Sequence, residues 1–199
     1  PRETALASEA DCWLRVRPGS DLALAMGLAN VLIQNKTFDE SFVRTWSNGP
    51  LLVRGDNGDL LRGADIGLAD GDDFVVWDLL LGKPRSSGDL SKSDLDAAAL
   101  EGSFEVVLGN GSGVIICSPA FKLYTEECSA YTLDRVAALT WIPVEQLELA
   151  ASLIGGSSRV AFHAWSGVGQ QANASQTDRA MACLYALTGS FDRNGGNRI

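Results

Sequence analysis

The residues best suited to chemistry lie in a polar stretch near the end of the sequence. Residues 166–173, SGVGQQAN, combine a hydroxyl, two glycines and three side-chain amides. The pattern predicts a strand before this stretch, at 160–165, and a helix after it, at 176–188. A polar loop at the end of a strand, followed by the free N–H groups of a helix, is a common ligand site in α/β proteins. An ordinary strand-to-helix connection has the same pattern, so both interpretations stay open.

Histidine-based acid–base and metal chemistry has a single candidate residue. His163 is the only histidine, which excludes a multi-histidine metal centre within this chain. It falls in the predicted strand, where a single histidine is more often a packed residue than a catalyst. A hydrolase that uses His163 is the weakest interpretation, because the sequence has no Gly-x-Ser-x-Gly motif around Ser166.

The four cysteines do not have metal-site spacing. They share no CxxC pattern and stand at Cys12, Cys117, Cys128 and Cys183. Zinc and iron–sulfur sites require closely spaced ligand pairs, so neither is expected here. Apolar neighbours around three of them, Cys12, Cys117 and Cys183, favour buried free thiols, and disulfides stay open.

Composition narrows the function classes. The chain has 199 residues, 46% of them apolar, and a net charge of −9. This charge argues against nucleic-acid or anionic-membrane binding as the main role. The sequence has no apolar run of the ~18 residues that a membrane helix needs, so we expect no direct membrane insertion. The chain begins PRET without a signal peptide and both ends are abrupt, so we expect a piece of a longer polypeptide.

A buried helix and a β-rich insertion organise the first two thirds of the chain. After a short predicted strand at 11–16, the segment 22–34 is apolar almost all round, which predicts a helix covered on every side. Ser20 or Asp21 would cap it, and Gly27 would permit close packing. Hairpins around the Asn57-Gly58 turn and between 104–108 and 114–117, a strand at 74–78 and a surface loop at 83–96 form the expected insertion, 51–117.

Helices return in the last third of the chain. We expect them at 119–129, 133–140 and 144–154, with Thr132 as the cap of the second and Pro143 as the first residue of the third. In the final helix, residues at helical spacing form a core-facing stripe: Ala180, Cys183, Leu184 and Leu187. Gly189 is the expected residue just beyond its end.

Three stretches in chain order carry a family resemblance. They are PRETA at 1–5 with RPGSDLAL at 17–24, YTLDRVA at 131–137, and SGVGQQAN at 166–173 with LTG at 187–189 and GGN at 195–197. Together they resemble the molybdopterin-guanine-dinucleotide oxidoreductases, the dimethyl sulfoxide reductase superfamily. The resemblance places this chain in the middle of a catalytic subunit.

The resemblance implies a role for each matching residue. Asp21 would accept hydrogen bonds from the guanine of a cofactor, although it could instead be a helix N-cap. Gly19 would let the backbone approach the nucleotide, and Arg2 would add positive charge near it. A pterin or phosphate part of a cofactor would be lined by Ser166, Gly167 and Gln170.

Two departures from the family pattern limit what the resemblance implies. Gln171 stands where family members often have histidine, which puts a proton-transfer role at that position in doubt. The molybdenum or tungsten ligand and the iron–sulfur cysteines of the family lie upstream of the matched region. The family's C-terminal domain is also missing here, so the chain alone should have no redox activity.

We therefore expect an α/β fold with parallel-sheet, Rossmann-like elements, buried helices and the β-hairpin insertion. One cofactor-binding region would span 1–130 and a second 131–199. The leading hypothesis is part of an oxidoreductase that binds bis-molybdopterin guanine dinucleotide with molybdenum or tungsten. Its partners would be the remaining domains and an iron–sulfur electron-transfer subunit, in a prokaryotic periplasm or cytoplasm. The alternative is a stand-alone, non-catalytic α/β module that binds a nucleotide or a protein.

Overall fold

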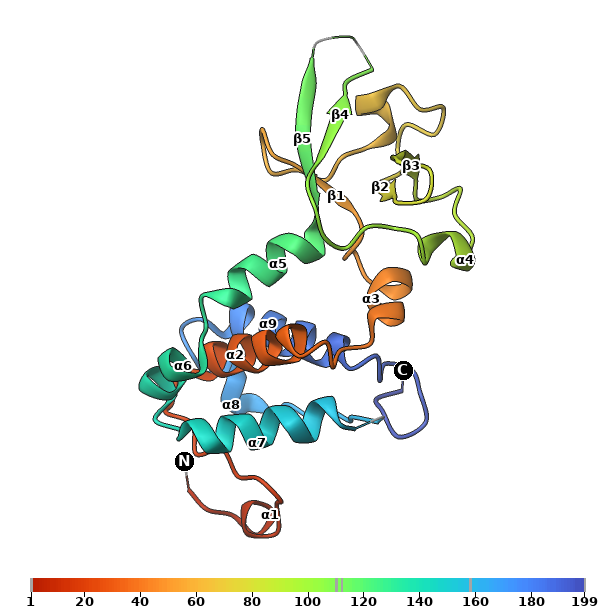
Figure 1. Ribbon diagram of the computed structural model, residues 1–199. Helices are drawn as coiled ribbons and strands as arrows, with labels where there is room; N and C mark the ends of the chain where they lie inside the picture. Colours follow the sequence, from red (N-terminus) through yellow and green to blue (C-terminus); the bar gives the residue numbers. More distant parts are fainter. Residues whose placement is uncertain (1, 110, 112, 158, 199) are drawn as a thin grey trace. The chain divides into compact units, whose positions relative to one another are not determined.

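The computed structural model describes residues 2–109, 111, 113–157 and 159–198. Contacts divide the chain into two compact units (Figure 1). The helical unit comprises residues 1–39 and 127–199, and the β-rich unit comprises residues 40–126. The expected insertion at 51–117 lies within the β-rich unit, whereas the expected boundary between cofactor-binding regions near residue 131 stays a prediction.

The helical unit is built around α2 (Asp21–Gln34), as its apolar sequence predicts. Half of its residues are buried: Ala23, Ala25, Gly27, Leu28, Ala29, Leu32 and Ile33. The helices that cover it are α6 (Leu133–Thr140), α7 (Val144–Gly155) and α9 (Ala174–Leu187). Two short helices, α1 (Ala5–Ser8) and α8 (Ser166–Gly169), complete the unit, and α5 (Ala120–Ser129) spans the boundary in the sequence.

Close packing at Gly27 joins α2 to α6. A Cβ atom at Gly27 would lie 2.5 Å from Cγ2 of Val136, so no larger residue fits without movement. Val136 belongs to a core cluster with Ile142 and Leu147, all of them at most 2% exposed. The predicted role of Gly27 is confirmed, and the loss of a side chain there lets two helices bury their apolar surfaces.

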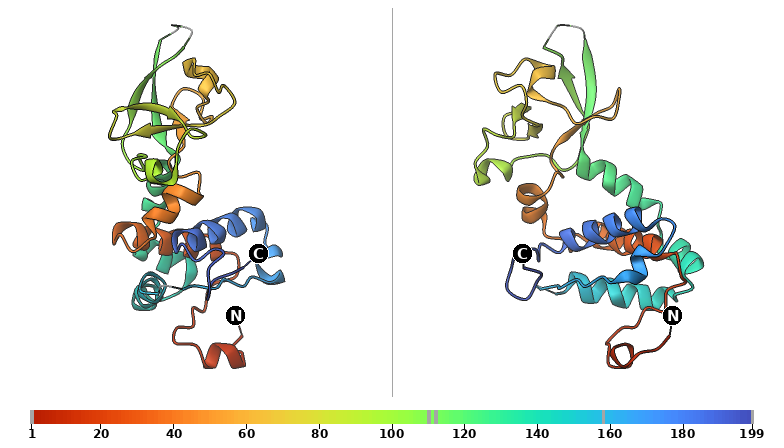
Figure 2. Two further views of the ribbon diagram at one scale, coloured as in Figure 1. Left: turned by 90° about the vertical axis from the view of Figure 1, so that its right-hand side faces the viewer. Right: turned by 180° about the vertical axis from the view of Figure 1, so that it is seen from behind.

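Helices α2 and α9 run side by side and point the same way (Figures 1 and 2). At their N-terminal ends, a Cβ atom on Gly19 would lie 3.4 Å from Oε1 of Gln171. At their C-terminal ends, the N–H of Asp39 donates to the carbonyl of Leu187 at 2.7 Å. The free N–H groups of both helices therefore emerge at the same end of the helical unit.

The β-rich unit contains two small antiparallel sheets. The first has the order β1-β5-β4, from β1 (Leu52–Arg54), β5 (Val114–Pro119) and β4 (Phe104–Val107). The second pairs β2 (Val75–Asp78) with β3 (Lys83–Ser86). The remaining elements are α3 (Glu40–Trp46), a 3-10 helix at Gly63–Ile66 and α4 (Lys92–Leu95).

The core of the β-rich unit is apolar and tightly packed. Its buried residues are Leu52, Leu61, Val75, Val106 and Cys117. Trp77 stacks on Phe104 at its edge, with ring centroids 4.4 Å apart. Burial raises the pKa of the Cys117 thiol to about 11, so this cysteine is neutral at pH 7.

All four cysteines are free thiols. Cys117 and Cys128 are buried, as the sequence predicts for Cys117. Cys183 is exposed, so its place in the core-facing stripe is wrong. The neighbouring stripe residues Ala180, Leu184 and Leu187 are buried, because α9 turns only this narrower face toward α2.

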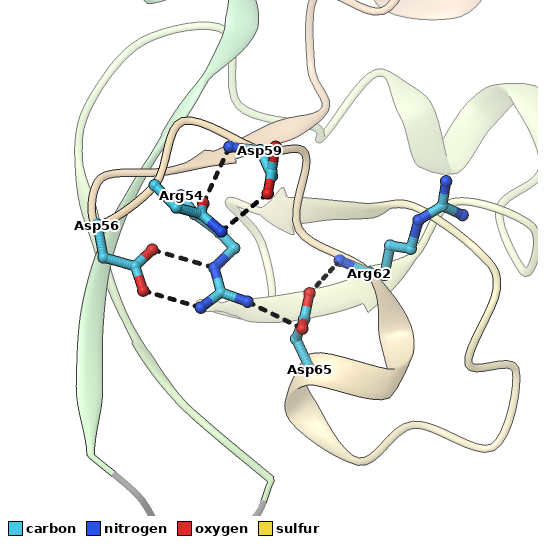
Figure 3. Close-up of polar contacts among 6 residues, drawn as sticks. Arg54, Asp56, Asp59, Arg62 and Asp65 are labelled. Atoms are coloured by element: carbon cyan, nitrogen blue, oxygen red, sulfur yellow. Dashed lines mark hydrogen bonds and ion pairs between the residues drawn. The ribbon is translucent and has the colours of Figure 1, made fainter.

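An arginine cluster closes the Asn57-Gly58 hairpin (Figure 3). The guanidinium of Arg54 donates to Asp56 at 2.8 and 3.0 Å and to Asp65 at 2.9 Å. Asp65 also accepts from the N–H of Arg62 at 2.9 Å, so one carboxylate joins the hairpin to the 3-10 helix. The hydrogen bond from Arg54 lowers the pKa of Asp56, which keeps the ion pair charged at neutral pH.

The class is α/β, but the strand arrangement differs from the expectation. Every strand pair among the described residues is antiparallel, so the expected parallel-sheet elements are not found in them. The segments 11–16 and 160–165 are not strands, because neither has a ladder partner within the described part of the chain. The predicted loop at 83–96 contains β3 and α4, since its serines and aspartates cap and close elements as well as forming loops.

Other local expectations are confirmed. The hairpin strands at 104–107 and 114–119 form, although Asn110 and Ser112 in their turn lie outside the described residues. Pro143 occupies the N-cap of α7, one residue earlier than predicted. In the described part of the chain, no helix combines the length and apolar character needed to cross a bilayer.

Candidate cofactor-binding site

The first half of the site is the turn that leads into α2. The N–H and Oγ of Ser20 donate to the carbonyl of Arg17 at 3.1 and 2.7 Å, which closes the turn. Gly19 has a φ of +85°, a conformation that favours glycine. Asp21 is the first residue of the helix and is half-buried.

The N-terminus of α2 is left without a side-chain cap. Ser20 occupies the N-cap, but its side chain makes no capping bond to α2 within the described residues. The prediction of a side-chain cap is therefore wrong here, and so is the interpretation of Asp21 as the N-cap. Thr132 shows the contrast, because its hydroxyl accepts from the N–H of Arg135 and caps α6. Uncapped N–H groups and the helix dipole favour an acceptor or an anion at this end of α2.

The second half of the site begins with the segment 160–165. It is extended, and Asn197 bonds to it as a strand would: Asn197 Oδ1 accepts from the N–H of Phe162 at 2.6 Å, and Nδ2 donates to its carbonyl at 2.6 Å. His163 is exposed, so the prediction of a packed histidine is wrong. The reason is that 160–165 has no neighbouring strand to bury it among the described residues.

A hollow of about 400 Å³ lies at the N-terminus of α9. It is lined by Ala164, Trp165, Val168, Gly169, Ala174, Ser175 and Asp178. Asn173 is the N-cap of α9 and makes no side-chain capping bond in the described structure. No atom lies within 4 Å of a Cβ built on Gly167 or Gly169, so their surroundings are open.

The structure brings the two halves together. The contact between Gly19 and Gln171 places the turn before α2 beside the loop before α9. Ser166, Gly167 and Gln170 are exposed, and their predicted roles stay predictions. The described contacts do not bring Arg2 to either half, so its predicted role stays a prediction.

The donor set at this end suits a phosphate-bearing nucleotide. Two uncapped helix N-termini supply N–H donors, and the glycines leave room for close approach of a ligand to the backbone. Asp21 supplies a carboxylate acceptor, which phosphates do not need but a guanine edge does. Within the described residues, no group of three or more histidine, cysteine, aspartate or glutamate side chains is arranged to hold a metal ion.

Trp141 lies beside the turn before α2 and was not singled out from the sequence. It follows the last residue of α6 with a φ of +64° and is 71% exposed. The guanidinium of Arg17 lies 4.9 Å from its ring centroid, and the N–H of Arg17 donates to the carbonyl of Thr140 at 2.8 Å. A tryptophan directly after a helix end, where glycine or asparagine is usual, is the sequence signal that could have revealed it.

Comparisons with known proteins find similarity to the alpha subunits of a dehydrogenase and a reductase. No protein-family model matches the chain. It is 33% identical to the dimethylsulfide dehydrogenase alpha subunit of Rhodovulum sulfidophilum, over 94% of this chain and 21% of that protein. It is 28% identical to the perchlorate reductase alpha subunit of Dechloromonas aromatica, over 96% of this chain and 23% of that protein. The chain thus spans about a fifth of the length of these relatives.

A solved structure shares the fold. Acetylene hydratase from Pelobacter acetylenicus matches 98% of this chain and 17% of its own, with a TM-score of 0.59. The sequences are 21% identical in this comparison, so it bears on the fold alone.

Proposed function

Because this chain belongs to the dimethyl sulfoxide reductase superfamily of molybdopterin oxidoreductases, we propose that it is part of the catalytic subunit of a molybdenum- or tungsten-dependent enzyme. The complete enzyme would transfer an oxygen atom or electrons to or from a small substrate. This chain would supply part of the cradle for bis-molybdopterin guanine dinucleotide. When bound, the metal held by the pterin dithiolenes would supply the redox centre.

One observation carries this proposal. Two segments far apart in the sequence, 17–21 and 166–171, meet at the uncapped N-terminal ends of two parallel helices. Both helices begin with residue types that could cap them, Ser20 and Asn173, yet neither side chain makes the capping bond in the described structure. A dinucleotide with two phosphates and a base would satisfy both ends at once.

In this proposal, each residue contacts a different part of the cofactor. Asp21 would accept from the N1–H and the amino group of guanine, and Gly19 would let the backbone lie against the nucleotide. Arg2 would approach it from the N-terminal segment. The pterin or phosphate part would lie along Ser166, Gly167 and Gln170, whose sequence neighbours Trp165, Val168 and Gly169 line the hollow at α9.

The same proposal accounts for the two segments that were expected to be strands and have no strand partner among the described residues. In the complete protein, 11–16 and 160–165 would be strands of a parallel, Rossmann-like sheet whose other strands come from elsewhere in the polypeptide. The two cofactor-binding regions, 1–130 and 131–199, would then lie against the rest of the catalytic subunit. An iron–sulfur cluster in an N-terminal part and an electron-transfer subunit would complete the enzyme.

Nucleotide titration of the chain tests the proposal. We expect GMP to bind, and we expect Asp21→Asn to weaken GMP binding by roughly 10- to 100-fold, since hydrogen bonds to a charged acceptor contribute about 1.5–3 kcal/mol. Asp134→Asn is the matched control, because Asp134 is likewise in the first turn of a helix of the same unit. Calorimetry with GMP and AMP measures both variants, and AMP binding should not change in Asp21→Asn.

The complete enzyme provides a second readout. Asp21→Asn should lower the molybdenum or tungsten content and the GMP released by acid hydrolysis per subunit, whereas Asp134→Asn should not. If the wild-type chain binds no guanine nucleotide and the complete Asp21→Asn enzyme keeps its full GMP content, the proposed guanine site is wrong.

A further inference from the structure

Trp141 ends α6 in a left-handed conformation, and stability does not explain why this exposed position carries a tryptophan. Its φ of +64° is in the left-handed region, where a bulky residue is a rare outlier. Its ring is mostly in water, with 71% of the residue exposed. Glycine would adopt this conformation without strain and would leave no apolar ring in solvent. A strained and exposed aromatic residue of this kind suggests a binding role.

Arg17 ties this ring to the turn before α2. Its guanidinium stacks over the Trp141 ring at 4.9 Å, and its N–H bonds to the residue before Trp141. The carbonyl of Arg17 accepts both bonds from Ser20, so Arg17 belongs to the tight turn that ends at Asp21. The side chain of Arg17 therefore joins Trp141 to the turn that carries Asp21.

We propose that Trp141 is the stacking platform for the purine base of the bound nucleotide. This inference rests on the proposed guanine site. Asp21 reads the edge of the base through hydrogen bonds, and Trp141 contacts its face. Arg17 covers one face of the indole as a cation and leaves the other face for the base.

The two contacts have different chemical signatures. Stacking on an aromatic ring tolerates any base, because every base has a π face. The carboxylate of Asp21 distinguishes guanine from adenine, because only guanine presents two adjacent donors to it. Trp141 therefore determines how tightly a purine binds, and Asp21 determines which purine binds.

Substitution by glycine separates binding from folding. Trp141→Gly suits the positive φ, so the urea midpoint of the helical unit should stay unchanged or rise. The Kd for GMP should rise about 5- to 150-fold, the range for loss of one base–aromatic contact. Trp141→Phe should keep most of the affinity, because it retains an aromatic face. Trp46→Ala, which removes another exposed tryptophan from the β-rich unit, is the control and should not change GMP binding.

The outcomes distinguish this inference from the function on which it rests. If Asp21→Asn weakens GMP binding and Trp141→Gly does not, the stacking role of Trp141 is wrong and the guanine site at Asp21 is supported. If Trp141→Gly and Trp141→Phe weaken GMP binding equally, loss of the aromatic face is not the cause and the inference is wrong. If the wild-type chain binds no purine nucleotide and the complete Asp21→Asn enzyme keeps its full GMP content, both the guanine site and the stacking role of Trp141 are wrong.

Discussion

The β-rich unit pairs its polar groups locally, whereas the helices α2 and α9 of the helical unit begin without a side-chain cap in the described structure. In the β-rich unit, Asp78 accepts from the N–H groups of Leu80 and Leu81 and pairs with Arg85 at 3.0 Å. Ser91 caps α4 through a bond to the N–H of Asp94. Its strands are paired, and these polar side chains find partners close in the sequence.

In the helical unit, several backbone groups of the same kinds lack side-chain or strand partners among the described residues. Ser20 and Asn173 begin its two central helices without a capping bond in the described structure. The segment 160–165 bonds to side chains and not to a neighbouring strand in the described structure, Val160 to Ser190 and Phe162 to Asn197. Trp141 stays exposed with a positive φ. Places where local rules are left unsatisfied are where function is expected, so the contrast separates a self-sufficient unit from one shaped for a ligand.

The largest expected effect tests whether binding belongs to the helical unit. Leu147 and Leu52 are each fully buried, one in each core. Leu147→Ala and Leu52→Ala should each destabilise their unit by about 2–5 kcal/mol, the cost of a cavity in a packed core. Hydrogen exchange read separately over each unit measures the loss, and GMP binding should weaken only in Leu147→Ala. Equal weakening in both variants would contradict the assignment of the site to one unit.

A smaller effect tests the self-sufficiency of the β-rich unit. Bonds from the Leu81 N–H, and next from Arg85, lower the pKa of Asp78. Its unfolded value is about 3.9, so its stabilising effect is fully present above that pH and is lost as pH falls through the lower, folded value. Asp78→Asn should lower the urea midpoint at pH 7 by less than Leu52→Ala does. The difference from wild type should shrink below about pH 4.

The control for this pH experiment is an exposed carboxylate of the same unit. Glu105 lies on β4 with its residue exposed, and Glu105→Gln should barely change the midpoint at any pH. A difference between Asp78→Asn and wild type that stays constant from pH 7 to pH 3 would show that the charge of Asp78 is not what stabilises its turn.

The smallest effect compares two helix starts within the helical unit. Thr132→Ala removes a bond that caps α6, so it should cost about 1 kcal/mol of unfolding free energy. Ser20→Ala should cost less, because the Ser20 hydroxyl donates to Arg17 and caps nothing in α2. Urea unfolding of the two variants measures the difference. An equal or larger loss in Ser20→Ala would mean that α2 depends on its serine as a cap after all.

Much of the fold could be predicted because it depends on local rules. The apolar run of α2, the Asn57-Gly58 hairpin and Thr132 as a cap all act within a few residues. The strands at 11–16 and 160–165 were predicted wrongly for the opposite reason. A strand requires a partner as well as a pattern, and the described part of the chain does not provide one.

The roles of the candidate site residues stay predictions, and only their positions can be compared with the structure. Gly19 and Asp21 could be singled out because the resemblance covers their stretch, and the structure places them beside the second stretch through Gln171. Trp141 was not singled out because residue types reveal neither its positive φ nor its contact with Arg17.

The sequence by itself determined the approximate extents of the long helices and that α2 is buried, and the family resemblance singled out candidate nucleotide-binding residues. Helix and hairpin formation depends on propensity, spacing and caps, which are properties of neighbouring residues. Only the tertiary structure decided that α2 and α9 run in parallel with both N-termini free at one end, and that Arg17 stacks on Trp141. Such contacts join residues far apart in the sequence, and they form because packing of the buried helices brings those residues together.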